Sequence, residues 1–261
     1  PHYKKTFQID KKVKRALLYI TALGLYEASL NGARVGDFVF APGWTSYRKR
    51  LQYQSYSVTD LLRQGDNQLD ILVGKGWLAG RLGLAEDQNK ENGEDTTALL
   101  SVLHVTYEDG TEETVATDSS WQVAGSRILF SEFYDGEIYD STIQPNDWEA
   151  CLIYEHDSSI LLAQEGSEIG EIETISAKEL LRTPKGEAVI DFWQNLTGYV
   201  RFSVIGKRGH KLTIRHSEIL DYDGNFDTGN LRTAKQEIVY TCNGEESAYQ
   251  PHFTFQGFRY I

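Results

Sequence analysis

Apolar and polar residues alternate over much of the chain, which is the pattern of strands with one buried face. Residues 26–30 alternate in this way up to Asn31-Gly32. Because both central residues of a two-residue hairpin turn need positive φ, Asn-Gly at this place predicts a β-hairpin. Asp109-Gly110, between two further alternating segments, predicts a second one.

Between these hairpins the pattern predicts another strand, with Leu69, Ile71 and Val73 on one face. An aromatic strand at 51–57 comes before it, followed by a short helical turn that Thr59 is expected to cap.

The pattern loosens between residues 144 and 186, where an acidic segment lies, and we place a domain boundary near residue 174. Beyond it the sequence predicts two strands around a Lys-Arg-Gly turn at 207–209. A last strand is predicted in 253–260, with an irregularity at Gly257. Helical periodicity is scarce throughout. The expected fold is therefore mainly β: two antiparallel β-sandwich domains of jelly-roll or supersandwich type in tandem, residues 1–174 and 175–261.

Composition narrows the classes of partner. The 40% of hydrophobic and 12% of aromatic residues favour a globular, strand-rich protein. A net charge of −12 argues against nucleic acid as a partner, and no apolar run is long enough to span a bilayer. Cys151, Cys242 and the histidines show no metal-ligand spacing, so the sequence predicts no metal cluster.

Two acidic segments are candidates for chemistry. Residues 131–141 contain four carboxylates, and glycoside hydrolysis needs two of them on opposite sides of a sugar, although an acidic loop between strands is the commoner explanation. The second segment, 221–230, resembles half of a calcium loop, but Gly224 stands fourth and Arg232 twelfth, where the calcium motif needs Gly sixth and Glu twelfth. A turn rich in Asp, Gly and Asn is the favoured interpretation. The residues concerned are Glu132, Asp135, Glu137 and Asp140 in the first segment, and Asp221, Asp223 and Asp227 together with the amide residue Asn225 in the second.

A third candidate is a sugar-binding set made of Trp44, Tyr47, Trp77 and Arg81. Sugars stack their C–H faces on aromatic rings and accept hydrogen bonds from guanidinium groups. Trp is also an ordinary core residue, so each of these side chains has a structural alternative.

Longer strings carry a resemblance to a known family. Residues 19–62, "GKGWLAGRLG" and "DGEIYDS" resemble the N-terminal β-sandwich of bacterial α-L-rhamnosidases, glycoside hydrolase family seventy-eight. Residues 182–235 and "FTFQGFRYI" resemble the next β-domain of the same enzymes. The chain departs from the family pattern at Trp193, where Gly is usual in "DFGQN", and at Phe255 and Gln256, which replace Tyr and His in "FTYHGFR".

The resemblance implies that an (α/α)₆ barrel follows these domains and carries the catalytic carboxylates of an inverting glycosidase. No catalytic residue is then expected in this chain. The implied partners are a rhamnose-containing carbohydrate and the catalytic domain of the same protein.

Some rhamnosidases carry a related module that binds L-rhamnose with calcium. Its ligands have no match here, because Arg48 and Lys49 stand where carboxylates would be needed, so calcium stays an open alternative to the expected absence of a cofactor. Two other functions stay open as well: a free-standing carbohydrate-binding module, and a scaffold that binds no sugar. The sequence does not indicate whether the protein is cytoplasmic or exported.

Overall fold

The computed structural model describes residues 1–82 and 96–261. They pack as two units, each formed by three stretches of chain. Unit 1 holds the described residues of Pro1–Ala79, Asn92–Ser126 and Pro145–Gly170; unit 2 holds those of Gly80–Glu91, Arg127–Gln144 and Glu171–Ile261. The expected boundary near residue 174 stays a prediction, but residues 127–144 pack with the later part of the chain.

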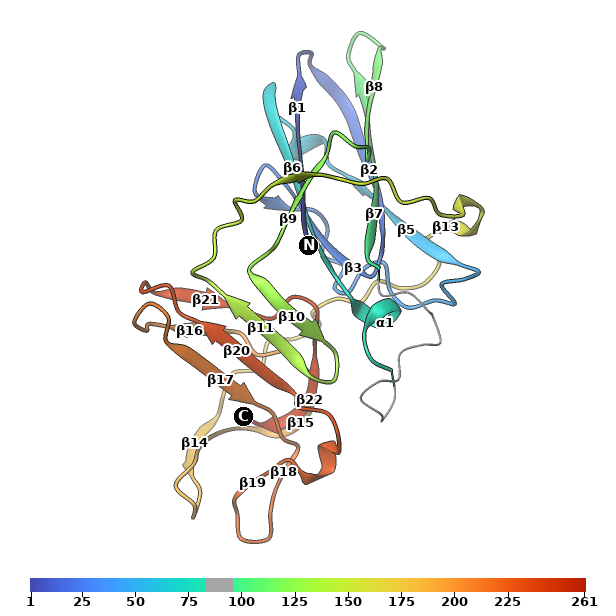
Figure 1. Ribbon diagram of the computed structural model, residues 1–261. Coiled ribbons are helices and arrows are strands. Elements are labelled where there is room, and N and C mark those ends of the chain that lie inside the picture. Colours follow the sequence, from blue (N-terminus) through green and yellow to red (C-terminus); the bar gives the residue numbers. More distant parts are fainter. Residues whose placement is uncertain (83–95) are drawn as a thin grey trace. The chain divides into compact units, whose positions relative to one another are not determined.

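Unit 1 is a sandwich of two sheets, drawn from blue to green in Figure 1. One sheet has the order β12-β9-β1-β6-β3-β4, and the other has the order β13-β5-β2-β7-β8. The strands are β1 His2–Ile9, β2 Val13–Leu23, β3 Leu25–Leu30, β4 Ala33–Arg34, β5 Leu51–Ser57, β6 Gly65–Gly74, β7 Ala98–Tyr107, β8 Glu112–Ala116, β9 Gln122–Ala124, β12 Glu149–Ala150 and β13 Leu161–Ala163.

Alternate residues of these strands fill the space between the two sheets. Leu69 and Ile71 of β6 pack in one core with Ile20 of β2, Leu103 of β7 and Trp121, and each of these residues is almost fully buried. The Asn31-Gly32 hairpin is confirmed, with φ of 55° and 81° at the two turn residues. The period-two pattern thus predicted both the strands and the face that each one buries.

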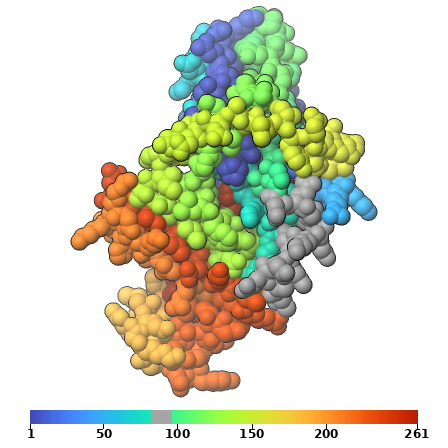
Figure 2. Space-filling view, in the orientation of Figure 1, coloured from blue at the N-terminus to red at the C-terminus, as the bar shows by residue number. Residues whose placement is uncertain are grey.

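A strap, residues 145–170, runs over the surface of unit 1 and contacts an edge of each sheet (Figure 2, yellow-green to yellow). Its β12 pairs with β9, and its β13 pairs in parallel with β5. Gln164, just after β13, accepts a hydrogen bond of 2.7 Å from the buried amide of Gln54. The strap therefore ties the two layers together.

Unit 2 contains a four-stranded sheet, β10-β11-β20-β17, and a three-stranded sheet, β14-β15-β22, together with two short pairs, β16-β21 and β18-β19. The strands are β10 Ile128–Glu132, β11 Gly136–Asp140, β14 Glu179–Arg182, β15 Ala188–Gly198, β16 Phe202–Val204, β17 Lys211–Arg215, β18 Ile219–Leu220, β19 Phe226–Asp227, β20 Glu237–Thr241, β21 Ser247–Tyr249 and β22 Gln256–Tyr260. Phe202 packs in both of its apolar clusters, one around Tyr240 and one around Phe258.

The mainly β, largely antiparallel fold is confirmed, and local expectations need four corrections. β11 and β20 pair in parallel, as β13 and β5 do. The strands on either side of the Lys-Arg-Gly turn do not pair with each other, because β16 pairs with β21 and β17 with β20. The last strand begins only at Gln256, and the irregularity lies in its partner β15, between Asp191 and Leu196.

The fourth correction concerns the helical turn. The 3₁₀ helix Thr59–Leu61 forms, but the side chain of Thr59 does not cap it. Its hydroxyl instead accepts the backbone N–H of Ala16 at 2.9 Å. The other helices are short: α1 Gly76–Ala79 and the 3₁₀ turns Ser158–Ile160 and Gly229–Leu231. None of the helices within residues 1–82 and 96–261 has the length and apolarity to cross a membrane.

Candidate functional site

The acidic segment 131–141 lies mostly in the hairpin of β10 and β11, called the acidic hairpin below. Its two glutamates point to opposite faces of this hairpin. Ser131 of β10 lies opposite Glu137 of β11, so these two side chains share a face. Since neighbouring residues of a strand alternate between faces, Glu132 must point the other way. This hairpin therefore cannot place Glu132 and Glu137 on the two sides of one sugar, as glycoside hydrolysis requires.

Glu137 is fully buried and satisfied by other parts of unit 2. Its carboxylate accepts a hydrogen bond from the Tyr249 hydroxyl and backbone N–H groups of His252, at 2.9 Å, and of Phe253, at 3.1 Å. A carboxylate held by donors on every side has no oxygen left for a substrate. Glu137 joins β11 to the segment that precedes β22.

Glu132 is also buried, and desolvation raises the pKa of its carboxyl above the ordinary value. One of its oxygens accepts the backbone N–H groups of Tyr134, at 2.8 Å, and Asp135, at 3.3 Å, across the hairpin turn. Both of these donors lie in the turn of the hairpin. The acidic segment is therefore a structural connection between two strands, which is the commoner role of such segments.

Arg81 lies in unit 2, whereas the aromatic residues proposed beside it lie in unit 1. Its guanidinium donates to Asp135 at 3.1 Å and to the Thr233 hydroxyl at 2.9 Å, and it stacks over Tyr134. Arg81 is buried by these contacts and holds the acidic hairpin.

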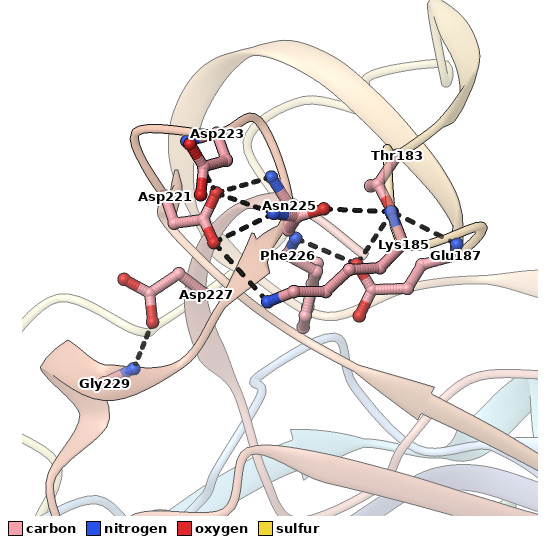
Figure 3. A network of polar contacts seen from close by, with 9 residues as sticks. All are labelled: Thr183, Lys185, Glu187, Asp221, Asp223, Asn225, Phe226, Asp227 and Gly229. Carbon is pink, nitrogen blue, oxygen red and sulfur yellow. Dashed lines mark hydrogen bonds and ion pairs between the residues drawn. The ribbon is translucent and has the colours of Figure 1, made fainter.

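In the loop of residues 221–230, the carboxylates of Asp221 and Asp227 accept hydrogen bonds from nearby backbone N–H groups (Figure 3). Oδ1 of Asp221 accepts the backbone N–H of Asp223 at 3.0 Å and that of Asn225 at 2.7 Å, and these bonds, chiefly the one from Asn225, lower the pKa of Asp221. The ammonium of Lys185 lies 3.6 Å from Oδ2. Asp227 accepts the backbone N–H of Gly229 at 2.9 Å.

The Asp221 carboxylate, in the first position of the calcium pattern, does not fit a calcium ligand, because N–H donors and an ammonium face both of its oxygens. Among residues 1–82 and 96–261, no three His, Cys, Asp or Glu side chains are grouped as metal ligands are.

Trp44 and Trp77 are brought together by the fold. Their rings are parallel within 6° with centroids 6.0 Å apart, and Phe40 meets Trp77 edge-on with centroids 6.3 Å apart. Trp44 keeps 60% of its surface exposed. Trp44 follows the turn that ends at Gly43, and Trp77 is the second residue of α1, the helical turn after β6. This pair is an exposed aromatic site of unit 1.

Tyr47 lies beneath this pair in the core. It is buried with Leu23, Leu51 and Leu78, and its hydroxyl donates to the carbonyl of Gly43 at 3.1 Å. Burial raises the pKa of that hydroxyl above its ordinary value. Tyr47 therefore supports the turn that carries Trp44 and has no surface to offer a sugar.

Sequence reasoning named both tryptophans but missed Phe40 and the turns that position the rings. A signal was available: each tryptophan directly follows a glycine, Gly43 and Gly76, and both glycines have positive φ. A Gly-Trp step of this kind places a large ring directly after a sharp turn.

Two family models match the chain in succession. Residues 11–175 match the α-L-rhamnosidase N-terminal domain, and residues 181–261 match the bacterial α-L-rhamnosidase concanavalin-like domain. Together they cover nearly the whole chain.

Individual proteins agree with these models. The α-L-rhamnosidase of Streptomyces avermitilis is 40% identical over an alignment of 263 positions, which covers 96% of this chain and 25% of that protein. One from Formosa agariphila is 32% identical over an alignment of 274 positions, which covers all of this chain and 29% of that protein. The chain therefore spans less than a third of the length of either relative.

Solved structures show the same fold. The native α-L-rhamnosidase of Aspergillus terreus matches with a TM-score of 0.94 at 39% identity, over 99% of this chain and 31% of that one. The α-L-rhamnosidase of Streptomyces avermitilis complexed with L-rhamnose matches with a TM-score of 0.93 at 39% identity, over 99% of this chain and 26% of that one.

Proposed function

Because the chain belongs to the α-L-rhamnosidase family, we propose that it forms the non-catalytic N-terminal part of an inverting enzyme that hydrolyses terminal α-L-rhamnosides. The observation that carries the proposal is the run of two consecutive family domains, which fills this chain and leaves most of each relative unmatched. The remaining part of such a protein would carry the reaction.

The proposed division of labour agrees with the chemistry of the described residues. Inverting hydrolysis needs one general acid and one general base that activates a water on the opposite face of the sugar. Glu132 and Glu137, the pair considered for these roles, are buried on opposite faces of one hairpin. The role proposed for this chain is to support the catalytic part and its substrate entrance.

A hydrolysis assay tests the absence of catalysis. The purified chain should not cleave an aryl α-L-rhamnoside above the rate of buffer alone. Turnover that disappeared in Glu132→Gln or Glu137→Gln, with the circular dichroism spectrum unchanged, would contradict the proposal.

A deletion tests the supporting role. Removing the region matched by this chain from the Streptomyces avermitilis enzyme should lower its melting temperature and its yield of soluble protein. A truncated enzyme with unchanged melting temperature and unchanged kcat/KM would show that the region supports nothing.

A second candidate function is carbohydrate binding by the chain itself, and the exposed Trp44 favours it over a scaffold that binds no sugar. Calorimetric titration with L-rhamnose separates the two. Because the Asp221 carboxylate faces N–H groups and Lys185, any binding should be the same with calcium and with a chelator. Heat that vanished with the chelator would contradict that expectation and indicate a calcium-dependent module.

A further inference from the structure

A strained turn holds the aromatic rings beside Trp77. Phe40 has a φ of 60°, which is unusual for a residue with a bulky side chain, and its carbonyl accepts the backbone N–H of Gly43 at 2.9 Å. Two hydrogen bonds hold this turn to unit 1. The backbone N–H of Tyr26 donates to the carbonyl of Ala41 at 2.8 Å, and the hydroxyl of Tyr47 donates to the carbonyl of Gly43. Backbone strain of this kind persists where surrounding contacts fix the conformation, and it is concentrated at binding sites.

The second tryptophan is fixed just as firmly from another part of the chain. Gly76 has a φ of 55°, and a Cβ added there would lie 2.4 Å from Cγ of Leu25, so the backbone presses directly against β3. Trp77 then packs against the buried cluster of Leu23, Tyr47, Leu51 and Leu78. Both rings therefore have set positions before any ligand arrives, which reduces the entropy lost on binding.

Packing alone does not explain Trp44. Its ring stacks on Trp77 on one side, and 60% of its surface remains in water. A smaller or polar residue would close the turn without exposing an indole. We infer that Trp44, backed by Trp77, is a platform on which the pyranose ring of an L-rhamnoside stacks through its apolar face.

The identity of the sugar rests on the proposed function, whereas the platform rests on the geometry. L-Rhamnose is a 6-deoxy sugar, so it offers a C6 methyl group as well as ring C–H groups to an indole. The turn directly after Trp44 carries Arg48 and Lys49, both exposed, and is closed by the bond from Lys49 N to Ser46 O, of 2.7 Å. Neither side chain forms an ion pair within the described part of the chain, so both have donors available to sugar hydroxyls.

Titration of the intact 261-residue chain with L-rhamnose, followed by calorimetry and by ligand-observed NMR, tests the site. Saturable binding is expected, and Trp44→Ala should weaken it about tenfold, which corresponds to the loss of about 1.4 kcal/mol of stacking. Trp44→Phe keeps an aromatic face and should recover most of the affinity.

Trp193→Ala is the matched control. Trp193 is 62% exposed, slightly more than Trp44, but it lies in unit 2, so its removal should leave the affinity unchanged. L-Mannose differs from L-rhamnose by a hydroxyl on C6 and should bind about fourfold more weakly, since a buried methyl contributes about 0.8 kcal/mol.

Three results would overturn the inference: no saturable binding by the wild-type chain, equal affinity of wild type and Trp44→Ala, or a loss in Trp193→Ala as large as in Trp44→Ala. Equal affinity for L-mannose would overturn the assignment of a deoxy sugar. Thermal melting of each variant identifies unfolding, and if Trp44→Ala unfolds, Trp44→Phe and Trp44→Gln decide. The hydrolysis and deletion experiments above do not depend on this site, so the two proposals fail separately.

Discussion

At the scale of single residues, His216 shows what burial does to a titrating group. It is almost fully buried, and desolvation lowers its pKa to about 4, against the opposing effect of its hydrogen bond to the carbonyl of Gln236. Because that carbonyl can only accept, the proton of the neutral ring lies on Nδ1. His216 lies directly after β17, and its burial depends on Phe258 packing from β22.

We expect His216 to make the protein sensitive to acid. Its folded pKa lies below the unfolded value of about 6.5, so the unfolded chain binds the proton more readily, and stability falls as pH drops from about 6.5 to 4. The shift corresponds to a loss of about 3 kcal/mol at pH 4. Urea unfolding across this range should show a steeper loss for wild type than for His216→Asn, and identical slopes would refute the assignment.

Trp193 occupies a conformation that normally belongs to glycine. Its φ is 67°, its backbone N–H donates to Asp191 at 2.6 Å, and Asp191 forms two bonds of 2.8 Å with Arg259. The Arg259 bonds lower the pKa of Asp191 and clamp the bulge of β15. The comparison with the family motif placed a glycine here, and the structure shows how a tryptophan is held in its place.

Replacing Trp193 by glycine and by alanine should therefore give two variants of different stability. Trp193→Gly relieves the positive φ, whereas Trp193→Ala keeps it, so the glycine variant should be more stable by about 1 kcal/mol. Chemical denaturation of the two variants measures this difference. An alanine variant as stable as the glycine variant would mean that the bulge relaxes.

At the scale of elements, turns were predictable and distant pairings were not. Asn31-Gly32 and Asp109-Gly110 carry their turn chemistry within two residues, and both hairpins form. The parallel pairing of β11 with β20 joins strands far apart in the sequence, with no local signal. Thr59 likewise found a partner on another strand, which a local capping rule cannot anticipate.

Gly136 makes the β11–β20 pairing sterically feasible. Its φ is 100°, and a Cβ there would lie 2.0 Å from the backbone oxygen of Glu237. Gly136→Ala should lower the free energy of unfolding by at least about 3 kcal/mol, because the carbonyl of Glu237 would have to move and alanine would be strained at a positive φ. Gly186→Ala is the control: φ is 86° there with nothing within 4 Å, so only the strain of about 1–2 kcal/mol is expected. Equal losses in the two variants would show that β20 yields easily.

At the scale of the whole molecule, the order of segments along the chain does not match the order of folding units. The loosened pattern predicted one domain boundary near residue 174. A hydrophobic pattern can indicate where a loop lies, but it does not indicate which sheet a hairpin joins. The hairpin of β10 and β11 precedes that point and pairs in unit 2. The candidate site follows the same rule: the sequence identified the two tryptophans, but only the structure shows that Arg81 packs in the other unit.

Polypeptide 175–261 is accordingly expected not to fold alone. It lacks β11, which pairs with β20, and it lacks Glu137, which binds Tyr249, His252 and Phe253. A heteronuclear NMR spectrum should show narrow amide dispersion, and polypeptide 127–261 should show wide dispersion. A well-dispersed spectrum from 175–261 would make residue 174 a true folding boundary.

The early position of this hairpin also matters during synthesis. Gly136 leaves the ribosome roughly a hundred residues before Glu237, which at about 5–20 residues per second is a delay of roughly 5–20 s. Throughout that interval Glu137 has none of its three partners, and one edge of β11 has no neighbour. A nascent chain in this state is a natural client for a chaperone that shields strand edges until β20 emerges.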